Sequence, residues 1–208
     1  MELNKRGILL VVSGPSGCGK GTVLSHILSD TEHYALSVSL TTRSPRNGEK
    51  HGVNYYFVTE EEFHENVRAN NMLEYAFFCD NFYGTPANKV DELLERGINV
   101  ILEIETKGAM QVKKVRPDAI LIMILPPSYE SLAFRLRNRK TETERTIRKR
   151  LNEAKKELRK LKRYHYCVIN HDNESEKTAE IIRSIVESEK HKTRRNPAIL
   201  DDFYNTNN

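Results

Sequence analysis

The chain has 208 residues, of which 38% are hydrophobic and 30% are charged, and its formal net charge is +4. This composition suits a folded domain, and the length suffices for one sizeable core. The two longest apolar runs, at residues 8–12 and 119–125, are far too short to cross a bilayer, so no membrane association is expected.

The cysteines and the N-terminus favour a cytoplasmic location. Three cysteines without a pairing pattern fit a reducing compartment, and the first strand starts too early to leave room for a signal peptide. The seven histidines show no metal-ligand spacing with the cysteines, so no zinc site is predicted.

The most informative segment is residues 14–22, with the sequence GPSGCGKGT. It follows an apolar run at 8–12 that predicts a strand, and it leads into a helical pattern at 20–29. A strand, a glycine-rich loop and a helix in this order form the context of a phosphate-binding P-loop. A chance glycine-rich turn is the alternative, and the flanking strand and helix disfavour it.

The P-loop interpretation rests on three physical effects. Glycines let consecutive backbone amides turn towards phosphate oxygens, and the helix N-terminus adds its positive dipole end. Lys20 would supply a mobile positive charge for the β- and γ-phosphates. The predicted ATP-binding residues are Gly14, Pro15, Ser16, Gly17, Cys18, Gly19, Lys20, Gly21 and Thr22.

One position departs from the usual P-loop pattern. Gly21 stands directly after the lysine, where a serine or threonine hydroxyl ordinarily meets Mg²⁺, and Thr22 comes one residue later. We expect Mg²⁺ as the cofactor that accompanies ATP, held by phosphates and water. No protein ligand is certain, and Glu103 or Glu105 is a candidate that would act through water.

The rest of the chain alternates between strand-like and helix-like segments. Strands are predicted at residues 98–104, 119–125 and 166–169, and helices at 86–96, 106–114, 128–138 and 174–190. Apolar strands that alternate with helices predict an α/β fold, a parallel sheet flanked by helices. Ligands of such sheets bind beyond the carboxyl ends of the strands, where this P-loop would lie.

Two insertions interrupt the alternation. Residues 36–85 are rich in aromatic and strand-forming residues and predict a small β-rich subdomain. Residues 135–163 predict an arginine-rich helical lid, with a long helix opened by a capping box of Thr141 and Glu144. The apolar stripe of this helix consists of Ile147, Leu151, Ala154, Leu158 and Leu161.

We therefore expect one domain over residues 1–208. Its core would comprise residues 1–35, 86–134 and 164–190, with the subdomain at 36–85 and the lid at 135–163. The tail at 191–208 is expected to be poorly ordered.

Several motifs follow the P-loop in a fixed order. The segment SLTTRSPRNGE begins at Ser39 and places two arginines three residues apart, and arginine forks bind phosphate oxygens bidentately. The motifs GVNY, EYA, YGT and LEIE come next. Together with the P-loop, this series resembles guanylate kinase from the first strand to about residue 189.

The resemblance implies an enzyme that transfers the γ-phosphoryl group of ATP to GMP, giving ADP and GDP. It implies that the GMP phosphate is held by Arg43, Arg46, Tyr55 and Tyr83, and that guanine is read by Ser39, Glu74, Thr85 and Glu105. It also implies a catalytic set of Lys20, Arg43, Arg135, Arg139 and Arg150. Arg148 is a nearby alternative for the role of a lid arginine that closes over the transferred group. Lys140 stands where the family usually has glycine.

The chemistry of guanine agrees with Glu74 as the main base-reading carboxylate. Guanine presents two adjacent donors, N1–H and the 2-amino group, which one carboxylate accepts together. The matching edge of adenine has an acceptor and C2–H, so a carboxylate there meets a lone pair. A polar mismatch of this kind discriminates by roughly 10⁴ or more.

Three other interpretations stay open at this point. The chain could phosphorylate another monophosphate, such as AMP or thymidylate, because its P-loop also resembles that of adenylate kinase. It could be a non-catalytic module that binds a phosphopeptide at the GMP site. Its basic residues at 135–163 could bind nucleic acid, although this leaves the P-loop unexplained. We expect GMP and ATP as partners, with no nucleic acid, and the oligomeric state is open.

Overall fold

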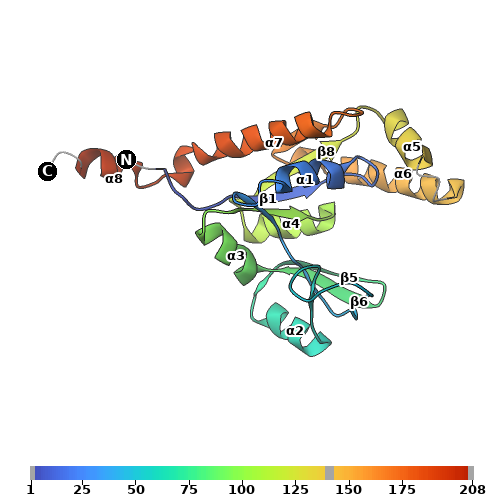
Figure 1. Cartoon of the computed structure of the whole chain (residues 1–208), viewed down its shortest axis with the longest axis horizontal. Coiled ribbons are helices and arrows are strands. Elements are labelled where there is room, and N and C mark those ends of the chain that lie inside the picture. The colour runs from blue at the N-terminus through green and yellow to red at the C-terminus, as the bar shows by residue number, and fades with distance from the viewer. Residues whose placement is uncertain (1–2, 139–142, 206–208) are drawn as a thin grey trace.

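The computed structural model describes residues 3–138 and 143–205 (Figure 1). Its main sheet has five parallel strands in the order β2-β7-β1-β8-β9. The strands are β1 (Leu9–Ser13), β2 (Tyr34–Leu36), β7 (Asn99–Glu103), β8 (Ile120–Leu125) and β9 (Tyr166–Ile169). Four of them were predicted, and β2 is a short edge strand that the sequence pattern did not reveal.

Helices cover both faces of this sheet because β1 is apolar on both sides. Leu10 and Val12 pack with α1 (Lys20–Leu28) and α7 (Ser175–Lys190). Leu9 and Val11, which point the opposite way, pack with α3 (Ala87–Glu95) and α4 (Thr106–Val115). The predicted α/β fold is therefore confirmed, with β1 and its P-loop at the centre of the sheet.

The predicted β-rich region contains a separate mixed sheet in the order β4-β3-β6-β5. Its strands are β3 (Leu40–Thr41), β4 (Tyr56–Phe57), β5 (Met72–Phe78) and β6 (Asn81–Pro86). The β5–β6 hairpin turns at Cys79 and Asp80, which both have positive φ. The sequence analysis missed α2 (Glu60–Arg68), whose N-terminus is closed by a capping box of Thr59 and Glu62.

The predicted lid consists of α5 (Tyr129–Asn138) and α6 (Glu144–Leu158), followed by the 3-10 turn η1 (Leu161–Arg163). The apolar stripe packs as expected: α5 and α6 share the cluster Leu132, Ala133, Leu136, Ile147, Leu151 and Ala154. Leu158 and Leu161 instead pack against the core. Figure 1 shows this helical pair at one end of the main sheet.

The predicted capping box at the start of α6 was wrong. The N-cap residue is Thr143, whose hydroxyl accepts a hydrogen bond from the Thr146 amide at 3.3 Å. Glu144 is the first helical residue and binds Arg137. Thr141 lies outside the described residues. The sequence offers two threonines two residues apart, and the local pattern did not decide between them.

The last region of the chain is the tail, which starts at residue 191. Over the described residues it forms η2 (Thr193–Arg195) and α8 (Ile199–Asn205), and α8 extends away from the body (Figure 1). The buried Asn196 side chain accepts from the Asn4 amide at 2.9 Å, which joins the two ends of the chain. Among the described helices, none is long and apolar enough to cross a membrane.

Replacing Phe63 with alanine should destabilise the protein by about 3–5 kcal/mol, because it empties a fully buried position. Phe63 in α2 is 0% exposed and stacks on Phe82 with ring centroids 5.3 Å apart. Phe77→Ala is the matched control, since Phe77 contacts the same ring but is 61% exposed. Urea unfolding of both variants checks this, and equal losses would contradict it.

Candidate active site

The P-loop leaves the carboxyl end of β1 and ends at Gly19, the N-cap residue of α1. Gly17 and Gly19 have φ of +95° and +91°, the left-handed region that glycine adopts without strain. Since Gly19 has no side chain, nothing from it occupies the first amides of α1. The prediction that those amides bind a phosphate stays a prediction.

Lys20 begins α1 and reaches back across the loop. Its Nζ donates a hydrogen bond to the carbonyl oxygen of Gly14 at 2.5 Å. The ammonium has three donors, so this bond leaves two for a phosphate or another acceptor. The structure thus places the predicted lysine over the P-loop backbone.

A buried amide holds the P-loop against the end of β9. Asn170 Nδ2 donates to the Cys18 carbonyl at 2.9 Å, and its Oδ1 accepts from Thr178 Oγ1 at 3.1 Å. A Cβ atom at Gly19 would lie 2.4 Å from Asn170 Nδ2. The sequence analysis missed Asn170, although its place just after a strand at the carboxyl edge of the sheet was an available signal.

Two of the three predicted lid arginines reach the P-loop. Arg135 donates to the Cys18 carbonyl at 3.2 Å and pairs with Asp172 at 2.7 Å. Arg150 donates to Ser16 Oγ at 2.7 Å. Arg148 instead lies 3.9 Å from Glu144 with a side chain that is 78% exposed, which favours Arg150 for the lid position. Arg139 and Lys140 lie outside the described residues.

On the small sheet, the two arginines of the TTRSPR segment share a carboxylate. Arg43 Nη2 donates to both oxygens of Glu49, at 2.9 and 3.0 Å, and Glu49 also accepts from the Arg46 amide at 2.7 Å. The bonds to Glu49 raise the pKa of Arg43. Glu49 was missed as a site residue, and it fixes the direction of the Arg43 guanidinium.

Aromatic rings frame the same guanidinium. Arg43 lies 5.5 Å from the centroid of the Tyr55 ring, and the rings of Tyr55 and Tyr83 are 6.1 Å apart. Arg43, Tyr55 and Tyr83 are therefore brought together as the resemblance implied. Arg46 is exposed beside them.

Two of the predicted base-reading residues, Glu74 and Thr85, form a pair on the small sheet. Glu74 on β5 faces Thr85 on β6, and Thr85 Oγ1 donates to Glu74 Oε1 at 2.8 Å. Glu74 is only 8% exposed, and this burial raises the pKa of its carboxyl. Its Oε2 lies 2.9 Å from the place of a Cβ at Gly108, so α4 closes over it at a position without a side chain.

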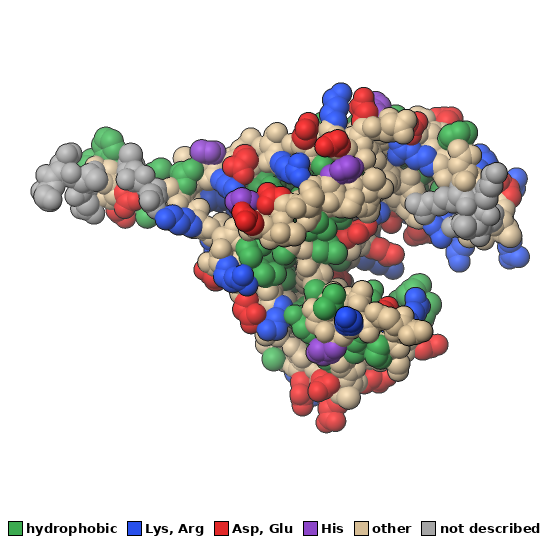
Figure 2. Space-filling view, in the orientation of Figure 1, with side chains coloured by type: hydrophobic (Ala, Val, Ile, Leu, Met, Phe, Trp, Pro, Cys, Tyr) green, Lys and Arg blue, Asp and Glu red, His purple; other side chains and the backbone are tan. Residues whose placement is uncertain are grey.

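A cleft of about 160 Å³ opens beside this pair, and Ser39, Tyr55, Thr85 and Glu103 are among its lining residues. Figure 2 shows the molecule hollowed between the body and the small sheet, on the side of the lid. Glu105 is the N-cap residue of α4 and is exposed.

The donor set suits a magnesium ion that is bound mainly through substrate. Glu103 stands opposite Val12 in the register of β1 and β7, at the sheet edge from which the P-loop departs. Within the described residues, no group of three or more histidine, cysteine, aspartate or glutamate side chains could hold a metal. Mg²⁺ commonly uses one or two carboxylates together with phosphates and water, so Glu103 and Glu105 fit it.

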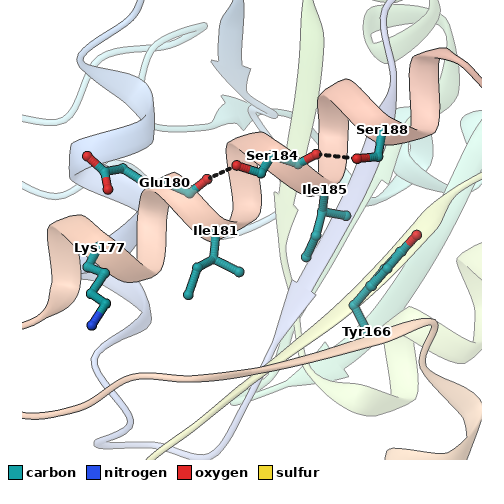
Figure 3. A pocket seen from close by; sticks show the side chains of 7 residues that line it. All are labelled: Tyr166, Lys177, Glu180, Ile181, Ser184, Ile185 and Ser188. Atoms are coloured by element: carbon teal, nitrogen blue, oxygen red, sulfur yellow. Dashed lines mark hydrogen bonds between the residues drawn. The ribbon is translucent and has the colours of Figure 1, made fainter.

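Another groove lies along α7 (Figure 3). The two serines in this groove donate hydrogen bonds to backbone carbonyls of α7 itself. Ser184 donates to the Glu180 carbonyl at 3.0 Å, and Ser188 donates to the Ser184 carbonyl at 2.9 Å. Lys177 and Glu180 carry opposite charges there. The residues that line this groove include no arginine and no P-loop residue.

The parallel sheet with a central P-loop, a basic helical lid and a second small sheet defines a P-loop nucleotide kinase. The guanylate kinase family model matches residues 6–189. Guanylate kinase of Clostridioides difficile (strain 630) is 47% identical over 196 residues, covering 94% of this chain and 95% of the relative. That of Latilactobacillus sakei subsp. sakei (strain 23K) is 44% identical over 202 residues, 97% of each.

The crystal structure of guanylate kinase from Anaplasma phagocytophilum matches with a TM-score of 0.69 at 31% identity, covering 96% of this chain and 95% of that one. The chain belongs to the guanylate kinase family. Its activity is that of guanylate kinase, with GMP and ATP as substrates. The family resemblance stated from the motifs is thereby confirmed.

Replacing Gly19 with alanine should collapse the P-loop, whereas Gly21→Ala should be tolerated. At Gly19 a Cβ would lie 2.4 Å from Asn170 Nδ2. Alanine there would also have to adopt the left-handed backbone conformation, which costs at least about 1–2 kcal/mol. At Gly21 a Cβ has nothing within 4 Å, and alanine in a helix is stabilising by up to about 1 kcal/mol. Thermal unfolding of both variants measures this, and a similar loss in each would argue against it.

Glu74→Gln should raise the stability of the substrate-free protein at neutral pH. Because the folded-state pKa of Glu74 lies above its unfolded value, the folded state binds the proton more readily. The buried carboxylate therefore costs stability above that folded pKa, and the cost vanishes as the pH falls below about 4.5. Unfolding curves at pH 4 and pH 7 test this, and an advantage that persists undiminished at pH 4 would refute it.

Proposed function

We propose that the cleft between the P-loop and the small sheet carries the guanylate kinase reaction, with each predicted residue in a defined role. The observation that supports this best is the Glu74–Thr85 pair, a buried carboxylate and hydroxyl joined at 2.8 Å beside the cleft. Burying a carboxylate without a charged partner is costly, and a ligand with two adjacent donors would offset that cost.

Guanine is that ligand. Its N1–H and 2-amino group donate to Glu74, and the hydroxyls of Ser39 and Thr85 complete the contacts, with Glu105 nearer the opening. An adenine ring would set an acceptor against the same carboxylate, so AMP is rejected by electrostatics and not by size.

The phosphate of GMP binds to Arg43 and Arg46 and to the hydroxyls of Tyr55 and Tyr83. Glu49 holds the Arg43 fork in place before the ligand arrives, which lowers the entropy that binding must fix. Arg46 is exposed and adds the second positive charge.

The triphosphate of ATP binds to the amides at residues 14–22 with Lys20 on the β- and γ-phosphates. Arg135, Arg139 and Arg150 of the lid neutralise charge on the transferred group. Their basic neighbours at residues 135–163 serve this closure and not a nucleic-acid partner. Mg²⁺, when bound, supplies further positive charge against these phosphates, with Glu103 or Glu105 holding its water shell.

No general base is required of the protein. The acceptor is a phosphate whose second pKa is about 6, so it is already largely a dianion at neutral pH. The barrier comes from bringing two polyanions together in line. Catalysis therefore consists of positioning and charge neutralisation, and lid closure excludes water that would otherwise hydrolyse ATP.

The direct test of this proposal is ADP formation from ATP and Mg²⁺ with GMP, AMP, dTMP, UMP and CMP offered separately. We expect turnover with GMP to exceed that with AMP by roughly 10⁴-fold or more. Comparable turnover with another monophosphate would overturn the base-reading roles. Nucleotide binding without any turnover would favour a non-catalytic phosphopeptide module.

Glu74→Gln should lower kcat/KM for GMP by about 10- to 100-fold, because an amide replaces one acceptor with a donor facing guanine. KM for ATP should stay within about twofold, since the P-loop is untouched. Steady-state kinetics with each substrate varied measures both effects. An equal loss for ATP and GMP would remove Glu74 from base recognition.

A further inference from the structure

A side chain from the core pairs with the edge strand of the small sheet. β5 is the last strand in the order β4-β3-β6-β5, so it has a strand partner on one side only. The Tyr75 amide of this strand donates to Gln111 Oε1 at 3.2 Å, and Gln111 Nε2 donates to the Tyr75 carbonyl at 3.1 Å. The Gln111 side chain therefore makes the two bonds that a neighbouring strand would make.

Gln111 lies on α4, and α4 is part of the core. Its neighbours Ala109 and Val112 are fully buried in the cluster that contains Leu9 and Val11 of β1. Figure 1 shows α4 on the side of the main sheet that faces the β5–β6 hairpin. The two bonds of Gln111 therefore fasten the small sheet to the core at one residue of β5.

The surroundings of β5 change at that residue. Leu73 belongs to the core cluster and is 2% exposed, and Glu74 is 8% exposed. From Tyr75 to Phe78 the strand is exposed. Gln111 thus holds the backbone where β5 leaves the core, one residue after Glu74. A fixed peptide at this point also fixes where the Glu74 side chain begins.

Gly108 lies one turn before Gln111, on the same face of α4. A Cβ atom at Gly108 would lie 2.9 Å from Glu74 Oε2 and 3.4 Å from Glu74 Cδ. The first distance is shorter than van der Waals contact, so a methyl group there would displace the carboxylate. The other carboxylate oxygen, Oε1, accepts from Thr85 at 2.8 Å. The Glu74 carboxylate therefore meets a hydroxyl at one oxygen and the bare backbone of α4 at the other.

We propose that Gly108 and Gln111 are positioning residues for the selection of guanine. Gln111 fixes the strand that carries Glu74, and Gly108 leaves the space that sets the direction of its carboxylate. A carboxylate accepts both donors of guanine only when its two oxygens face them, so a displaced carboxylate loses one of the two bonds. The inference rests on the proposed role of Glu74 in reading guanine.

Gly108→Ala separates the position of Glu74 from the stability of the fold. The methyl group displaces the end of a flexible side chain, and alanine is a better helix former than glycine, so the thermal unfolding midpoint should not fall. KM for GMP should rise by about tenfold or more, with KM for ATP within about twofold of wild type. Normal GMP kinetics, or a fall in the midpoint together with a rise in both KM values, would overturn the role of Gly108.

Inosine monophosphate (IMP) reports on the carboxylate directly, because it keeps N1–H and lacks the 2-amino group. The ratio of kcat/KM for GMP to that for IMP measures the second bond to Glu74. In both Gly108→Ala and Gln111→Ala this ratio should fall by about fivefold or more. A defect that is merely structural would slow both substrates alike and leave the ratio unchanged, which would contradict the inference.

Lys114→Ala is the matched control for Gln111→Ala. Lys114 lies one turn later on α4 and is exposed, and its side chain does not make the bonds to Tyr75. K114A should stay within about twofold of wild type in KM for GMP, whereas Q111A should raise this KM by about fivefold or more. Equal effects of the two substitutions would remove Gln111 from the positioning of Glu74.

A double-mutant cycle with Glu74→Gln tests whether both residues act through Glu74. In the E74Q background, G108A and Q111A should change KM for GMP by no more than about twofold. The same loss in both backgrounds would show that they act by another route. If E74Q by itself leaves GMP kinetics and the GMP/IMP ratio unchanged, the proposed function fails. If E74Q lowers both while G108A and Q111A are normal, this inference alone fails.

Discussion

The carbonyl oxygen of Cys18 is the point on which the site depends. It accepts hydrogen bonds from Asn170 at the end of β9 and from Arg135 of the lid. One backbone oxygen thus joins the P-loop, the edge of the sheet and the arginine-rich helices.

Cations of the site are held by carboxylates before any substrate binds. Asp172 holds Arg135, and Glu49 holds Arg43. A cation held in this way loses less conformational entropy when it meets a phosphate. Glu74 is the exception, since its partner is the neutral hydroxyl of Thr85.

Much of the fold followed from local patterns. The apolar run of β1, the glycines after it and the helical spacing from Lys20 predicted the strand, P-loop and helix, since each depends on neighbouring residues. The prediction missed α2, which is polar on most of its surface, and placed the start of α6 at the wrong threonine. Short β2 gave too weak a pattern, and its pairing with β7 defines it.

The sequence by itself determined which residues are present, and from them it predicted a phosphate cradle, arginines for phosphate and a carboxylate for guanine. The tertiary structure decided how those groups are supported. Asn170, Asp172 and Glu49 are ordinary polar residues until the chain brings each of them against a P-loop carbonyl or an arginine. Their importance comes from contacts between segments far apart in the chain or from a specific turn geometry. Composition and periodicity do not reveal such contacts, because they describe only which residues are present and how they are spaced along the chain.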